Sequence, residues 1–140
     1  MLLDKSLIPK VAVEKMNQIH DVEIDILNKL YESIEKYEKN ESSLEEIEHL
    51  FEEFLKDVQE HFSFEQGLME EYNFFAYPMH KGEHDRVLME LDQLKRKFEK
   101  SKDPSLLKSY LSQIFVPWIV NHVQTMDTVT AHFLSHFVRD

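Results

Sequence analysis

Apolar residues recur every three or four positions along four long stretches of this chain, which is the spacing of the buried face of an amphipathic helix. The stretches cover roughly residues 9–37, 43–72, 79–100 and 104–137. The joints between them are short and cover residues 39–42, 73–78 and 101–103. Because short joints favour antiparallel neighbours, the pattern predicts an all-α fold, an antiparallel up-down-up-down four-helix bundle.

The inward faces of the four expected helices mix apolar residues with histidines and carboxylates. In chain order these faces read Val13, Met16, His20, Glu23, Leu27, Leu30 and Ile34; Leu44, Ile47, Phe51, Phe54, Val58, His61, Glu65 and Leu68; His80, His84, Val87, Leu91, Leu94 and Phe98; and Leu107, Leu111, Phe115, Trp118, His122, Val129 and Phe133. Histidines that share a helix face with core residues are expected to point inward.

The composition favours one folded helical domain over residues 1–140. The chain has two glycines, four prolines and 42% apolar residues, which suits long helices around a real core. Its net charge of −11 disfavours binding to nucleic acid or to an anionic membrane surface. No apolar run approaches the ~20 residues of a membrane span, and the start lacks the features of a signal peptide, so we expect a cytoplasmic protein. The absence of cysteine excludes thiolate ligands and iron–sulfur clusters.

Four of the histidines are expected at one level of the bundle. His20 lies about 18 residues before the end of its helix, and His61 lies about 18 residues after the start of the next. His84 lies about 16 residues before the third helix ends, and His122 about 18 residues after the fourth begins. At ~1.5 Å per residue, all four lie roughly 24–27 Å from the connecting loops, so an antiparallel bundle brings them into one layer.

Further imidazole and carboxylate groups accompany these histidines one helical turn away. His61 with Glu65, and His80 with His84, are four residues apart, about 40° around a helix, so both members of each pair can face one ion. A single buried histidine is more commonly a core residue bonded to a carbonyl. Packing alone gives no reason to bury five imidazoles and two carboxylates in one layer, whereas iron accepts both groups as ligands. The predicted ligands are His20, His61, Glu65, His80, His84, His122 and Asp127.

His122 and Asp127 are five residues apart, about 140° around a regular helix. Either the two side chains flank the bundle axis from two sides of one helix, or the helix is locally widened. Pro117 removes a backbone donor and is expected to kink the same helix, with or without a functional role. We therefore predict an irregularity between Ile114 and Asp127.

The ordered pattern H…HxxxE…HxxxH…HxxxxD resembles the hemerythrins, and most of all the single-domain bacterial hemerythrin-like proteins. The resemblance covers roughly residues 10–135. It is carried by His20, His61-Phe62-Ser63-Phe64-Glu65, His80-Lys81-Gly82-Glu83-His84 and the ten residues from Trp118 to Asp127, with Trp118 four residues before His122.

By that resemblance, the bundle holds two iron ions with an oxo or hydroxo group between them. One iron is bound by His80, His84 and His122, and the other by His20 and His61, while Glu65 and Asp127 bridge the two. The two-histidine iron keeps an open position for dioxygen. The family's apolar pocket around that position corresponds here to Phe62, Trp118, Ile119 and Val123.

Glu23 departs from the family members with which the pattern agrees, because the position three residues after the first histidine is usually apolar. A buried, unpaired carboxylate is unfavourable, so this side chain needs a role. Three roles for this side chain remain open from the sequence alone. Glu23 can ligate the two-histidine iron and fill its open position, hydrogen-bond a bound water, or lie shielded at the edge of the bundle.

The function that this pattern favours is reversible dioxygen binding by a carrier, store or local supplier, rather than catalysis. Dioxygen is the expected partner, together with a reductase or an oxygen-using enzyme. The alternatives are a diiron redox enzyme (a peroxidase, an oxidase or a nitric oxide reductase) and an oxygen or redox sensor. Seven ligands exceed one tetrahedral zinc, and the one Glu-x-x-His string, ending at His49, has its histidine off the inward face, against a ferritin-type site.

Overall fold

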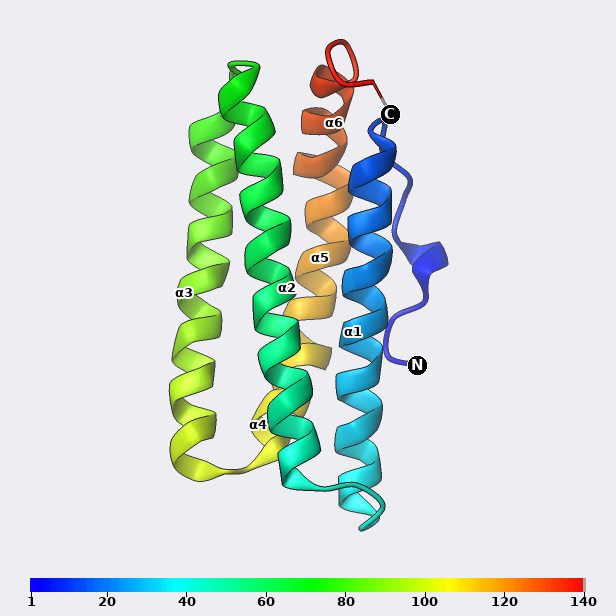
Figure 1. The fold of residues 1–140 in the computed structure, drawn as a ribbon, viewed down its shortest axis with the longest axis vertical. Coiled ribbons are helices and arrows are strands. Elements are labelled where there is room, and N and C mark those ends of the chain that lie inside the picture. The colour runs from blue at the N-terminus through cyan, green and yellow to red at the C-terminus, as the bar shows by residue number, and fades with distance from the viewer. Residues whose placement is uncertain (140) are drawn as a thin grey trace.

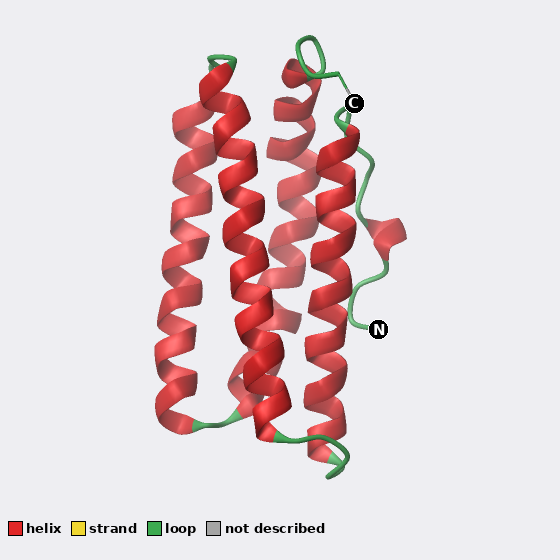
Figure 2. Ribbon diagram, in the orientation of Figure 1, coloured by secondary structure: helices red, strands yellow, loops and turns green. Residues whose placement is uncertain are grey.

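The computed structural model, which describes residues 1–139, has four helical columns packed side by side (Figures 1 and 2). The columns are α1 (Glu14–Glu38), α2 (Leu44–Glu71), α3 (Tyr77–Ser101) and a segmented fourth column that contains α4 (Pro104–Tyr110), α5 (Val116–His122) and α6 (Thr128–Leu134). Consecutive columns run in opposite directions, and the fourth packs against both α3 and α1. The predicted up-down-up-down four-helix bundle is confirmed.

Polar side chains cap the starts of α2 and α4. The Ser43 hydroxyl accepts a hydrogen bond from the backbone N–H of Glu46 at 3.1 Å, so it caps α2. Asp103 accepts one from the N–H of Ser105 at 3.0 Å, and Pro104 takes the first position of α4, where no backbone donor is needed.

Asparagine, not glycine, ends the first two columns. Asn40 and Asn73 have φ values of 60° and 53°, in the left-handed region that asparagine tolerates. The next residue in each case donates its backbone N–H back into the helix, Glu41 to the carbonyl of Lys36 and Phe74 to that of Met69. Both glycines of the chain therefore lie inside helices, away from these turns.

The segment before α1 is the main departure from the predicted boundaries. Residues 9–13, expected to be helical, are not, because the side-chain amide of Asn17 bonds both the N–H and the carbonyl of Val11, at 2.8 and 3.0 Å. Asn28 pairs in the same way with the backbone of Leu3. The segment before α1 contains a short 3₁₀ turn, η1 (Lys5–Leu7), and lies along α1. It buries Leu3 and Val13 against this helix.

The other boundaries differ by a few residues. α3 begins at Tyr77, two residues earlier than predicted, with Pro78 inside its first turn. The last helix ends at Leu134 and not at residue 137. None of the helices among the described residues is long and apolar enough to cross a membrane.

The fourth column contains two π-helical turns, η2 (Leu111–Phe115) and η3 (Val123–Asp127). The predicted irregularity is confirmed, although η2 begins before Ile114. Each π turn adds a residue to the helical repeat and so rotates the residues after it around the helix axis. For this reason the expectation for Val129 was wrong: this residue is 52% exposed, and Thr130 takes the inward position.

Candidate metal centre

All five predicted histidines and both carboxylates meet in the core, each at most 2% exposed. Their ligand atoms form two groups, within each of which all atoms lie within 4.8 Å of one another. The first group contains three histidines from α3 and α5, and the second two histidines from α1 and α2; both contain the same two carboxylates. The first is Glu65, His80, His84, His122 and Asp127, and the second is His20, His61, Glu65 and Asp127.

Each carboxylate divides its two oxygens between the two groups. Oε1 of Glu65 lies 3.3 Å from Nε2 of His84, whereas Oε2 lies 2.8 Å from Nε2 of His61. Oδ1 of Asp127 lies 3.2 Å from Nε2 of His122, and Oδ2 lies 3.1 Å from Nε2 of His20. The two carboxylates therefore stand between two separate positions, in the manner of bridging ligands.

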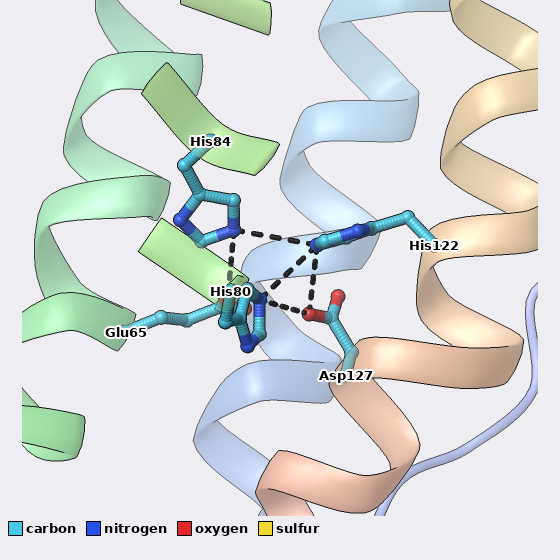
Figure 3. A group of neighbouring side chains, drawn as sticks. All are labelled: Glu65, His80, His84, His122 and Asp127. Carbon is cyan, nitrogen blue, oxygen red and sulfur yellow. Dashed lines mark hydrogen bonds and ion pairs between the residues drawn. The ribbon is translucent and has the colours of Figure 1, made fainter. Parts of the chain in front are cut away.

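The three-histidine group surrounds one point (Figure 3). Nε2 of His122 lies 3.2 Å from that of His80 and 3.3 Å from that of His84. Ligand bonds of about 2.1 Å at right angles place neighbouring ligand atoms about 3 Å apart, so these spacings suit one shared cation.

Buried polar atoms without partners fit the same interpretation. Oε1 of Glu65 and Oδ1 of Asp127 make no hydrogen bond to any of the described residues, although both residues are fully buried. Such atoms destabilise a fold unless something else satisfies them, and two carboxylates facing converging imidazoles match a cation. The donor set, imidazole and carboxylate without thiolate, suits iron.

The electrostatics of the cluster keep its carboxylates ionised. Burial by itself raises their pKa values, but the neighbouring histidines outweigh it and hold the pKa of Glu65 and of Asp127 well below the usual range. Burial lowers the pKa of His20 and His80, yet the adjacent carboxylates of Asp127 and Glu65 raise both to about 9. For His84, burial prevails and the pKa is lowered. At neutral pH the metal-free centre therefore pairs ionised carboxylates with protonated imidazoles, and a bound cation would displace those protons.

The helix geometry at η3 brings Asp127 to the cluster. In a π turn the hydrogen bonds join residues five apart, so those residues share a face. The backbone N–H and the hydroxyl of Thr128 both bond the carbonyl of Val123, the hydroxyl at 2.6 Å, and hold the turn open. Of the two sequence alternatives, local widening is the correct one.

Polar side chains outside the cluster contact the Nδ1 atoms of two of its histidines. Nδ1 of His80 lies 2.7 Å from the Thr130 hydroxyl, and Nδ1 of His84 lies 3.5 Å from the Gln66 amide. Sequence reasoning missed both partners. Thr130 had a usable signal, since it stands one turn after Asp127 and only the extra residue of η3 hid its inward position.

Glu23 lies behind His61. It is 1% exposed, and its Oε1 lies 3.0 Å from Nδ1 of His61, on the opposite side of the ring from the cluster. Burial lowers the pKa of His61, but the charge of Glu23, followed by that of Glu65, raises it well above the usual value. This arrangement differs from the three that the sequence left open.

Aromatic rings cover the three-histidine side. Phe62 stacks on His84 with ring centroids 3.9 Å apart, and Trp118 stacks on His122 at 4.5 Å. The indole N–H of Trp118 donates to Glu83 at 2.7 Å, so the outer edge of the ring is fixed at the surface. The remaining pocket candidates, Ile119 and Val123, are 2% and 0% exposed. Phe62 and Trp118 thus cover part of the cluster with apolar rings, and Ile119 and Val123 are buried in the hydrophobic core.

Comparison with known proteins agrees with this geometry. Residues 11–133 match the family described as "Hemerythrin HHE cation binding domain". A bacteriohemerythrin of Aquifex aeolicus is 37% identical over 135 residues, which cover 96% of this chain and 99% of that protein. A bacteriohemerythrin of Pseudomonas aeruginosa is 23% identical over 134 residues, which cover 92% of this chain and 82% of its own.

Proposed function

Because the chain belongs to the hemerythrin family, we propose that its cation centre is a diiron site that binds dioxygen reversibly. The observation that carries this proposal is the division of the Glu65 and Asp127 oxygens between two groups of histidines. One ion would satisfy only half of each carboxylate, whereas two ions use all four oxygens.

The ligand roles follow the two groups. His80, His84 and His122 would hold one iron, His20 and His61 would hold the other, and Glu65 and Asp127, which belong to both groups, would be shared between them. When bound, the iron pair supplies the electrons that dioxygen needs in order to bind. Because one position has a histidine fewer than the other, it offers the free coordination site.

Phe62 borders both positions, because its ring lies 5.2 Å from that of His61 and 3.9 Å from that of His84, whereas Trp118 stacks on His122 of the three-histidine group. Ile119 and Val123 are at most 2% exposed, and we propose that these four side chains form the apolar wall of the oxygen pocket. A dry wall keeps protons and water away from bound oxygen and so favours release over reduction. We further propose that the protein works in the cytoplasm as a carrier, store or supplier, with a reductase to restore the ferrous state.

Reversibility decides the proposal. The protein is loaded anaerobically with ferrous iron, exposed to air and then returned to vacuum while its visible absorption is followed. We expect about two irons per chain and a colour that appears and disappears over several cycles. His61→Ala should abolish the reversible colour, whereas His49→Ala, at an exposed position of the same helix, should retain it.

Colour that does not reverse, accompanied by consumption of peroxide or nitric oxide, would contradict carriage and indicate a diiron redox enzyme. One iron per chain at saturation would contradict the bridged pair itself.

A further inference from the structure

Glu23 is a buried carboxylate that is hydrogen-bonded to a proposed ligand. It is 1% exposed, and its Oε1 lies 3.0 Å from Nδ1 of His61. Nε2 of the same ring lies 2.8 Å from Oε2 of Glu65. The imidazole of His61 is therefore held between two carboxylates, one inside the cluster and one outside it.

The outer partners of the other histidines are weaker. Nδ1 of His80 meets a neutral hydroxyl, that of His84 meets an amide at 3.5 Å, and that of His20 has no partner among the described residues. Of these four histidines, His61 alone has a carboxylate from residues 1–139 behind its ring. The asymmetry falls on the two-histidine group, where oxygen is proposed to bind.

A carboxylate behind a ligating histidine has known physical effects. It accepts the Nδ1 proton, which fixes the tautomer that leaves Nε2 free for the metal, and it makes the ring a stronger electron donor. In a buried site the added negative charge also favours the more highly charged state of a nearby ion.

We propose that Glu23 is a positioning residue that orients His61 through its Nδ1–H and biases the two-histidine iron toward the ferric state. Glu23 does not ligate the iron itself, because it lies on the far side of the ring from the cluster. This inference rests on the proposed diiron function, and it makes Glu23 a determinant of how readily that iron is oxidised.

Two substitutions separate the charge of Glu23 from its hydrogen bond. Glu23→Gln keeps an acceptor of the same shape, so the iron content should stay at the wild-type level while the reduction potential becomes more positive and oxidation by air slows. Glu23→Leu removes the acceptor, and the affinity for one of the two irons should fall by about 10- to 100-fold, measured by competition with a chelator. Circular dichroism and denaturation of both metal-free variants report whether each has folded.

Asp57→Asn is the matched control for charge. Asp57 is half-buried and lines the same cavity between α1 and α2 as His61; its carboxylate interacts with Glu23 through space, but it makes no hydrogen bond to His61 in the described structure. Removing the charge of Asp57 should shift the reduction potential of the iron by much less than Glu23→Gln does. A zinc-loaded wild-type protein should also show a proton NMR signal for the hydrogen-bonded Nδ1–H of His61, which Glu23→Leu should lose.

The outcomes separate the two proposals. Unchanged potential and affinity in both Glu23 variants, or equal shifts in Asp57→Asn and Glu23→Gln, would overturn the positioning role while the diiron site stands. A wild-type protein that binds no iron would overturn both.

Discussion

The two halves of the bundle use the same kind of inward helix position in opposite ways. Near the α1–α2 and α3–α4 joints these positions hold Leu30, Ile34, Phe51, Phe98 and Leu107, all at most 4% exposed and all apolar. Further along the same columns, equivalent positions hold five histidines and two carboxylates that are equally buried. The comparison shows that burial alone does not identify a core: one half is completed by packing and the other by a cation.

The two halves should therefore fail in different ways. In the apolar half, stability depends on volume, since interiors pack at crystal-like density. In the polar half it depends on whether each buried group has a partner. Three kinds of experiment distinguish dependence on volume from dependence on partners: substitution of single residues, removal of the metal and a change of pH.

The largest expected effect is loss of the metal from the polar half. Glu65→Gln removes a charge from both ion positions at once without changing the shape of the side chain, so most of the iron should be lost. Metal analysis after desalting measures this loss. Glu60→Gln, at an exposed position of the same helix, is the control and should retain the iron. Full iron content in the Glu65 variant would show that the carboxylate is not a bridge.

A cavity in the apolar half should act on stability alone. Leu30 is fully buried, so Leu30→Ala is expected to lower the free energy of unfolding by about 2–5 kcal/mol, measured by denaturant titration. The iron content should remain unchanged. Val22→Ala, at a half-exposed site in α1, should change stability by about 0.5 kcal/mol or less. Loss of iron from the Leu30 variant would mean that the halves are not independent.

Removing the metal should weaken the polar half. At a free iron concentration about 100 times the dissociation constant, binding stabilises the fold by ~2.7 kcal/mol, and a chelator should remove that increment. Because distant sites usually act additively, the Leu30→Ala protein should lose the same amount. Equal stability with and without iron would argue that the ion does not complete this half.

A further expected effect is a pH dependence of the metal-free protein. The pKa of His20 and of His80 is about 9 in the fold and near 6.5 in the unfolded chain, so the folded state holds these protons more tightly. Their contribution to stability is complete below about pH 6.5 and is lost as pH rises through about 9. The iron-loaded protein should show the opposite trend at low pH, where protons compete with metal for the histidines. Denaturation curves at pH 6, 7.5 and 9 would settle the sign.

The sequence predicted most of this structure because its signals are periodic and local. Four apolar faces, short joints and histidines at matched distances from them give the bundle and its polar layer. Residues 9–13 were assigned wrongly because the side-chain amide of Asn17 binds the backbone of Val11, which helical periodicity does not reveal. Val129 was misplaced because a π turn changes the register of every residue after it.

The site was predictable as a set of residues, but its outer partners were not. Glu23 stood out as a carboxylate on an apolar face, yet its partner became clear only when α1 and α2 were packed together. Gln66 carries no chemistry that distinguishes it from other polar residues, and the position of Thr130 one turn after Asp127 points inward only once the extra residue of η3 is known. Hydrogen bonds between columns depend on how each helix is rotated about its axis and how far it is shifted along that axis. Both are properties of the tertiary structure.

The η3 turn makes the path of the backbone, and not only the residues present, a condition for binding. If Val123–Asp127 closed into a regular α-helix with the same residues, His122 and Asp127 would lie about 140° apart around the axis, and Asp127 would face away from His20 and His122. Both ions would then lose a shared anchor. A change that only restored regular backbone hydrogen bonds in this turn would keep every ligand type and still leave a well-folded but inert bundle.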